Sequence, residues 1–255
     1  MPLEIVTIPC LADNYAFLLH ADETGETALI DIPEAAPISA ALAGRGWALT
    51  EVWITHHHYD HIDGLDELAE AGAASLTGAR ADAHRLPPLN RQVGDGDSFD
   101  FAGHKVRVMD VSGHTIGHIA YHVPDAGAVF TADSLMAMGC GRVFEGTPDQ
   151  MWASLSKLAA LPPETLVCSG HEYTQANARF AVTVDPDNPA LAARIADIAG
   201  RRAAGEPTVP SLLSDEQATN PFLRAVDAAV KAHIGLPDAT DAAAFAEIRA
   251  RKDRF

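Results

Sequence analysis

The densest group of potential catalytic side chains lies between positions 56 and 61, in the pattern His-x-His-x-Asp-His. It contributes the imidazoles of His56, His58 and His61 and the carboxylate of Asp60. Nitrogen and oxygen donors at this density are what a divalent transition metal requires. On extended backbone the rings of His56 and His58 point to the same side, whereas Asp60 and His61 diverge unless the chain turns there. One short segment can therefore serve two neighbouring metals, and a dinuclear site is the leading hypothesis.

Three later segments each place one more donor directly after a predicted strand. They are His114 in Ser-Gly-His-Thr, Asp133 in Thr-Ala-Asp-Ser and His171 in Ser-Gly-His-Glu. Each of them alone fits an ordinary loop residue or a hydrogen-bonded core histidine. Donors at four strand ends of one chain are much harder to explain in that way. A mixed set of imidazoles and carboxylates suits zinc, iron or manganese.

Alternating strands and helices must position these donors. Apolar runs and period-two alternation predict strands over 3–8, 15–20, 27–32, 51–54, 98–101, 104–111, 119–123, 128–131 and 165–168. Helical spacing and start and stop signals predict helices over 36–43, 64–71 and 151–160. The histidine cluster follows the predicted strand 51–54 directly, and α/β folds usually carry function at such strand ends.

Beyond His171 the sequence becomes rich in alanine and proline. Helical periodicity predicts helices over 190–204 and 241–254. We therefore expect two domains, a catalytic domain over residues 1–172 and a mainly helical domain over 173–255. The length of 255 residues is sufficient for one large core and a smaller extension.

Composition narrows the class of protein. The net charge of -17 argues against nucleic-acid binding through a basic face. Apolar stretches are too short for a membrane span, and the N-terminus lacks a signal-peptide pattern, so a cytoplasmic location is expected. A monomer is also expected. Three cysteines do not form a disulfide framework. Positive charge is concentrated at the C-terminus, in Arg249, Arg251, Lys252 and Arg254.

The order of the four donor motifs resembles the metallo-β-lactamase superfamily, which implies a four-layer αββα sandwich. The resemblance implies that His56, His58 and His114 hold one metal ion. It gives the second metal to Asp60, His61 and His171, with Asp133 bridging the two ions. His57 and His118 match the motifs without being ligands, and His118 is expected to orient a neighbour.

Further segments resemble the glyoxalase II family, the hydroxyacylglutathione hydrolases, over essentially the whole chain. These segments are Ala12–Tyr15, Gly139–Gly146, Gly170–Thr174, Asn220–Arg224 and Arg249–Phe255. The resemblance implies that the helical domain binds glutathione. The matching substrate-binding residues are Arg142, Phe144, Tyr173, Arg249 and Lys252, although Phe144 stands where the family often has tyrosine. Two basic residues spaced three apart on a helix share a face and can bind a carboxylate.

The resemblance implies hydrolysis of S-(2-hydroxyacyl)glutathione thioesters. S-D-lactoylglutathione would give glutathione and D-lactate, the second step of methylglyoxal detoxification. The expected nucleophile is a hydroxide bound by two metals, with zinc expected first and iron or manganese as alternatives. Asp60 and Asp133 would orient it.

Three alternatives to this thioesterase remain. The first is a persulfide dioxygenase of the same superfamily with one iron, which lacks the helical extension. The second is a nucleic-acid metallohydrolase, which the acidic charge disfavours. The third is a non-enzymatic metal-binding protein, which the open coordination positions disfavour. Cys140 is expected to be a small structural residue.

Overall fold

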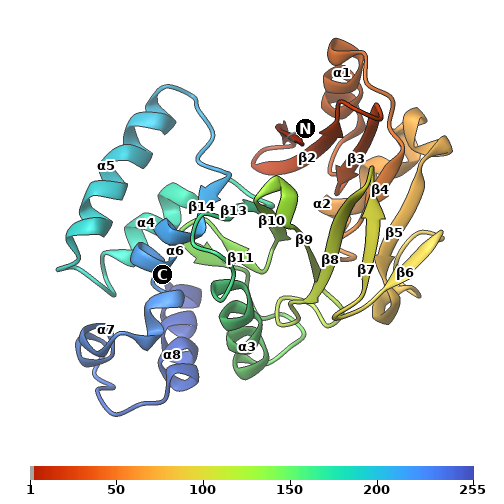
Figure 1. Ribbon diagram of the computed structural model, residues 1–255. Helices are drawn as coiled ribbons and strands as arrows, with labels where there is room; N and C mark the ends of the chain where they lie inside the picture. The colour runs from red at the N-terminus through yellow and green to blue at the C-terminus, as the bar shows by residue number, and fades with distance from the viewer. Residues whose placement is uncertain (1–2) are drawn as a thin grey trace. The chain divides into compact units, whose positions relative to one another are not determined.

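The protein is described by a computed structural model that covers residues 3–255 (Figure 1). Met1 and Pro2, which begin the segment compared with signal peptides, lie outside the described residues. The chain forms two compact units. The first contains the residues up to Val111 together with Ile116–Ala132, and the second contains Ser112–Thr115 and Asp133–Phe255. The domain boundary expected after residue 172 stays a prediction.

Two sheets form the first unit. One sheet has the order β1-β2-β3-β4-β5-β6, antiparallel from β1 to β3 and parallel from β3 to β6. Its strands are β1 Glu4–Cys10, β2 Asn14–Ala21, β3 Glu26–Ile30, β4 Glu51–Trp53, β5 Ser75–Ala79 and β6 Arg91–Val93. In the other sheet four consecutive strands pair antiparallel. They are β7 Ser98–Phe101, β8 His104–Asp110, β9 Ile119–Val123 and β10 Ala128–Ala132.

Aromatic side chains pack between these two sheets. Trp53 of β4 contacts Phe101 and Tyr121 edge-on or tilted, with ring centroids 5.4 Å apart in each pair. Phe17 of β2 meets Phe130 of β10 at 5.7 Å. Every residue of β2 is buried, including the apolar run from Tyr15 to Leu19. The core fixes the register of β4 and therefore the starting point of the histidine cluster.

Helix α1 Ala35–Arg45 packs on the other face of the first sheet. Its Ile38 and Leu42 join Leu29 and Val52 in one apolar cluster. The helix ends where Gly46 adopts a left-handed conformation, with φ 68°.

The helix predicted over 64–71 is wrong. The structure has two 3-10 segments there, η1 Asp63–Glu67 and η2 Ala69–Ala73. Leu68 between them is extended, with φ -83° and ψ 92°, and buries its side chain in the core. Burying this one side chain interrupts the helix. Further 3-10 segments of this unit are η3 Arg80–Asp82 and η4 Pro124–Ala126.

The second unit is mainly helical. Its helices are α3 Pro148–Ala159, α4 Thr174–Ala181, α5 Pro189–Ala203, α6 Leu213–Thr219, α7 Ala228–His233 and α8 Asp241–Arg254, with the 3-10 segment η5 Leu223–Val226. It also contains two antiparallel strand pairs. These are β11 Leu135–Met136 with β12 Gly139–Cys140, and β13 Leu166–Ser169 with β14 Ser211–Leu212. The helices predicted over 190–204 and 241–254 are confirmed as α5 and α8.

Polar side chains begin several of these helices. Asn188, Asp227 and Thr240 accept hydrogen bonds from backbone N–H groups at the first turns of α5, α7 and α8. Helices α3 and α8 lie side by side (Figure 1), with the Trp152 and Phe245 rings 5.8 Å apart. None of the helices within residues 3–255 has the length and hydropathy needed to span a bilayer.

Candidate functional site

The histidine cluster of the first unit bends as the donor spacing requires. His56 and His58 follow β4 on extended backbone, with the Nε2 atom of His56 and the Nδ1 atom of His58 3.1 Å apart. The short helix α2 Tyr59–Ile62 then turns the chain. Because of this turn, the side chains of Asp60 and His61 do not point to opposite sides as they would on extended backbone. The Nε2 atom of His61 lies 3.9 Å from Oδ2 of Asp60. Both pairs therefore stay together on one short segment.

Asp31 is a functional residue that the sequence analysis missed. Its buried carboxylate accepts hydrogen bonds from the backbone N–H and the hydroxyl of Thr55, each at 2.8 Å. It also accepts the Nδ1 proton of His61 at 2.8 Å. A carboxylate cannot donate, so this bond leaves the Nε2 lone pair of His61 available for a metal. Three ligand atoms, from Asp31, His56 and His61, lie within 4.8 Å of one another.

Two other histidines lie close to the cluster without joining it as donors. His57 points its Nδ1 atom at Asp82, 3.1 Å from Oδ2. The ring of His118 stacks on that of His56 with centroids 4.5 Å apart and planes 11° apart. This stacking restricts the orientation of the His56 ring.

Asn14 anchors the carboxylate donor of this cluster. Its side-chain amide donates to the backbone oxygen of Asp60 at 3.0 Å and to Oδ2 at 3.1 Å. Asn14 belongs to the Ala-Asp-Asn-Tyr segment that follows β1, so a residue far away in sequence sets the direction of the Asp60 carboxylate.

In the second unit, Asp133 stands between two imidazoles. Its Oδ2 atom is 3.4 Å from Nε2 of His114, and its Oδ1 atom is 3.3 Å from Nε2 of His171. The Nδ1 atom of His114 donates to the carbonyl oxygen of Arg142 at 2.8 Å, which leaves the Nε2 lone pair towards Asp133. The ring of His171 stacks on Tyr173 at 4.6 Å. A carboxylate with one oxygen beside each imidazole is suited to bridging two ions.

The donor distances in both units fit a metal ion. Ligands bound tetrahedrally at zinc distances lie roughly 3.3 Å apart. The nitrogen–nitrogen separation between His56 and His58 is 3.1 Å, and Asp133 lies 3.3 and 3.4 Å from its two imidazoles. Several of these rings are buried, and carboxylates and carbonyls set their tautomers. The residues present therefore suit a divalent transition metal.

Gly141 allows the close packing beside Asp133. A Cβ atom at this position would lie 2.0 Å from the backbone oxygen of Asp133 and 2.9 Å from Nδ1 of His114. Any other residue would displace the backbone that carries one donor or the ring that forms another. The glycine in Gly-Cys-Gly-Arg therefore has a steric role.

The five predicted substrate-binding residues all belong to the second unit. Phe144 and Tyr173 are 61% and 40% exposed, which is unusual for large aromatic side chains. The Phe144 ring lies 5.2 Å from that of His114. Arg142 is exposed, and its Nε atom is 3.9 Å from Oδ1 of Asp253.

Arg249 is the most buried of the five, with an exposed fraction of 5%. It donates to the Cys140 carbonyl at 3.0 Å and to Oδ1 of Asp253 at 2.8 Å. Its guanidinium lies 5.0 Å from the centre of the Phe222 ring. These bonds hold the guanidinium rigidly, so Arg249 contributes a fixed charge and supports the Cys140 backbone.

Lys252 is half-buried beside further cations. Its ammonium donates to the Ala176 carbonyl at 3.4 Å and lies 5.3 Å from the centre of the Phe180 ring. Burial lowers the pKa of Lys252, and the charges of Arg249, Arg179 and Arg142 lower it further. Several cations therefore share one region with Asp253, and an anionic ligand would relieve their repulsion.

The thiol of Cys140 lacks the properties of a nucleophile. Burial raises its pKa to about 11, although the charge of Arg249 opposes the shift. The thiol stays protonated at neutral pH, and the nucleophilic form is the thiolate. This agrees with the structural role expected for Cys140.

Two family models together match nearly the whole chain. The model described as metallo-beta-lactamase superfamily matches residues 15–171, and the model described as hydroxyacylglutathione hydrolase C-terminus matches residues 172–255. Curated proteins named hydroxyacylglutathione hydrolase are 66% identical in Ruegeria pomeroyi and 67% identical in Roseobacter denitrificans. Each alignment covers 255 residues and 100% of both proteins.

Solved structures at lower identity share the fold. The BLEG-1 B3 metallo-beta-lactamase has a TM-score of 0.67 at 18% identity, covering 86% of this chain and 99% of its own. ETHE1 from Myxococcus xanthus has a TM-score of 0.67 at 24% identity, covering 98% of this chain and 90% of its own. The predicted α+β metallo-β-lactamase fold with a helical C-terminal region is confirmed.

Proposed function

This chain belongs to the hydroxyacylglutathione hydrolase family within the metallo-β-lactamase superfamily, and we propose from that premise the reaction, the ligands and the substrate contacts. It is a metal-dependent hydrolase. Its reaction is hydrolysis of S-(2-hydroxyacyl)glutathione thioesters, with S-D-lactoylglutathione giving glutathione and D-lactate.

The segment from Asp133 to Phe144 supports this assignment most directly. Its Arg142 carbonyl fixes the His114 ring, while the Arg142 side chain joins the cations around Asp253. The backbone of this segment therefore supports the proposed ligand His114 and also carries Arg142, one of the cations that would bind an anion. A thioester whose far end carries carboxylates would need both.

The proposed ligand set is the one expected from the sequence. His56, His58 and His114 would hold one ion, Asp60, His61 and His171 would hold the other, and Asp133 would contribute to both. Two divalent ions held there would supply hydroxide at neutral pH and Lewis-acid polarisation of a thioester carbonyl. Zinc is the proposed metal, because imidazole donors with a minority of carboxylates suit it.

The side chains of the protein supply orientation. Asp60 and Asp133 accept hydrogen bonds from the attacking water and direct its lone pair at the carbonyl carbon. Asp31 and the Arg142 carbonyl hold the donor rings in the required tautomers. The leaving thiolate is a weak base, so no side chain has to protonate it.

Substrate binding is assigned to the second unit. The cations Arg142, Arg249 and Lys252 attract the carboxylates of glutathione in a chain whose net charge is -17. The exposed rings of Phe144 and Tyr173 flank the peptide part of glutathione.

We also propose that the domain boundary lies after residue 172 and that the protein is a monomer. We propose a cytoplasmic location as well, which the three free cysteines support.

A thioesterase assay with matched substrates tests the proposal. We expect hydrolysis of S-D-lactoylglutathione and little hydrolysis of the same acyl group on coenzyme A. The Asp133→Ala variant should lose bound metal and activity together. Lys252→Ala should raise KM much more than it lowers kcat, because the cation contributes binding rather than chemistry.

Arg254→Ala is the control for Lys252→Ala, because Arg254 is an exposed cation on the same helix. It should change KM little. Equal KM values for wild-type protein and the Lys252→Ala variant would contradict the assigned carboxylate contact. Equal hydrolysis of both thioesters would contradict the assigned substrate class.

A further inference from the structure

The short hairpin formed by β11 and β12 has a polar anchor in the helical part of the second unit. We propose that Glu216 and Asn220 act as a positioning pair that holds the tip of this hairpin and thereby sets Asp133 and Arg142 at its two ends. The effect on catalysis rests on the proposed function, whereas the bonding of the hairpin tip rests on the contacts alone.

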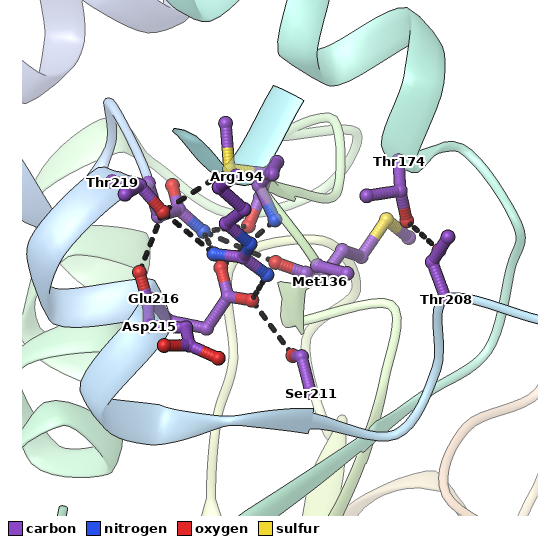
Figure 2. Close-up of polar contacts among 12 residues, drawn as sticks. Met136, Thr174, Arg194, Thr208, Ser211, Asp215, Glu216 and Thr219 are labelled. Atoms are coloured by element: carbon purple, nitrogen blue, oxygen red, sulfur yellow. Dashed lines mark hydrogen bonds and ion pairs between the residues drawn. The ribbon is translucent and has the colours of Figure 1, made fainter. Parts of the chain in front are cut away.

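The carboxylate of Glu216 is completely buried, with 0% exposure. Figure 2 shows it between Arg194 of α5 and Ser211 of β14, and both of these side chains donate to its Oε1 atom. Its Oε2 atom accepts the backbone N–H of Met138 at 2.8 Å and the amide of Asn220 at 3.0 Å. Each of these four partners is a donor, so both carboxylate oxygens are used as acceptors.

Asn220 completes the anchor at the backbone of the hairpin. Its side-chain amide donates to the carbonyl oxygens of Met136 at 3.1 Å and Gly139 at 2.9 Å. Asn177 of α4 donates to the intervening carbonyl of Ala137 at 3.1 Å. The backbone of the tip, residues 136–139, is therefore bonded by side chains from α4 and from the C-terminal end of α6.

The conformation of the tip requires support. Met138 adopts a φ of 59°, in the left-handed region that residues other than glycine seldom occupy. Its N–H is the group bonded to Glu216, and its sulfur accepts the hydroxyl of Thr219 at 3.3 Å. The buried carboxylate therefore stabilises a backbone state that is unfavourable by itself.

The two ends of the hairpin carry the functional groups. Asp133 lies two residues before β11, and Arg142 lies two residues after β12. The ends are joined by the Gly141 N–H, which donates to the Ser134 carbonyl at 3.1 Å. A shift of the tip would therefore move the carboxylate beside His114 and the carbonyl that orients that ring.

The Glu216→Gln variant tests the pair. An amide NH2 in place of one carboxylate oxygen would face donors, so the tip should lose bonds while the side-chain volume stays the same. The readouts are amide hydrogen exchange over residues 134–142, the rate at which a chelator removes zinc, and KM for S-D-lactoylglutathione. We expect exchange over this segment to rise about tenfold or more, as loss of a charged hydrogen bond implies. Zinc loss should be faster and KM should be higher.

Asp185→Asn is the matched control. Asp185 is also a buried carboxylate of the second unit that accepts from an arginine, Arg224, and from Asn188, away from the hairpin. It should lower the melting temperature without changing exchange over 134–142 or zinc release. Asn220→Ser, which removes the two bonds to the hairpin and leaves the Glu216–Arg194 pair, gives the same test if Glu216→Gln does not fold.

Wild-type exchange and zinc release in the folded variants would overturn the proposal. So would equal changes in Asp185→Asn, because the network would then only stabilise the fold. Exchange and zinc release are measured without substrate. They therefore decide the inference even if wild-type protein fails to hydrolyse the thioester, a result that would contradict only the proposed function.

Discussion

At the scale of single residues, the orientation of the donors depends on groups that bind no metal. Asp31 accepts from Thr55 and from His61, and the Arg142 carbonyl accepts from His114. Each acceptor fixes which ring nitrogen carries the proton, and the opposite nitrogen then carries the lone pair that a metal would use. Loss of such a supporting contact is therefore expected to weaken metal binding.

Asp31→Asn should weaken metal binding. The amide is a poorer acceptor for the Nδ1 proton of His61, and loss of such a support typically reduces metal affinity roughly 10–100-fold. Competition between the protein and a chromophoric chelator measures the effect. Asp82→Asn is the control, because Asp82 supports His57, which is not a proposed ligand. Equal loss of affinity in the two variants would contradict the role of Asp31.

The lowered pKa of Lys252 predicts a pH dependence of binding. Burial and neighbouring arginines lower the pKa of Lys252 from the ordinary 10.5, so the ammonium loses its proton at a lower pH than an exposed lysine does. Binding of a carboxylate therefore weakens as the pH rises through this lowered pKa and is strongest below it. Calorimetry with S-methylglutathione from neutral to alkaline pH measures the change. In Lys252→Arg the cation persists, so the part of the pH dependence due to residue 252 should disappear.

At the scale of elements, the N-terminus of α3 supports the His114 loop. Thr147 accepts from the Gln150 N–H at 3.2 Å, and the Gln150 side chain accepts from the Thr147 N–H at 2.9 Å, forming a capping box. Gly146, just before the cap, donates to the Gly113 carbonyl at 3.2 Å. Ser154 on the same helix donates to the Ser112 carbonyl at 2.6 Å. Helix α3 thus holds the backbone on which His114 stands.

Thr147→Ala should destabilise the protein modestly. Loss of the cap lowers the free energy of unfolding by about 1 kcal/mol, and Thr147→Ser should restore most of it. Urea unfolding monitored by circular dichroism measures the change. A Thr147→Ala variant with wild-type stability would show that the cap contributes nothing measurable.

Elements with long periodic patterns are also the ones that could be predicted. Helix α8 Asp241–Arg254 coincides with the helix predicted from helical periodicity, and Thr240 caps its start. The two-residue strand β11 and the three-residue strand β6 carry no pattern long enough to recognise. The helix predicted over 64–71 failed for another reason. Leu68 adopts extended backbone there and buries its side chain, although the spacing of apolar residues is helical.

At the scale of the whole molecule, function depends on separating charge. The chain carries a net charge of -17, yet Arg142, Arg179, Arg249 and Lys252 influence one another closely enough to lower a pKa. The acidic remainder repels anions, whereas the local cations would attract an anionic substrate under the proposed function. Bound metal ions would neutralise the negative charges of the proposed carboxylate ligands, Asp60 and Asp133.

Metal removal should therefore affect both activity and stability. A chelator should abolish thioester hydrolysis and lower the melting temperature, because ions that bind only the folded state stabilise it. Added zinc should restore both, and added magnesium should not, because imidazole donors disfavour it. Elemental analysis of the active protein should give close to two metals per chain. Full activity with one metal per chain would contradict the dinuclear proposal.

The sequence by itself determined the donor types, the spacing in His56–His61, the helical character after residue 172 and the family. These depend on local patterns, which the order of residues carries directly. Tertiary structure alone revealed Asp31 as the support of His61, Arg249 as a buried support of Cys140, and Glu216 as the anchor of a hairpin about eighty residues away. Such contacts join segments distant in the chain, and no local pattern encodes which buried acceptor meets which donor.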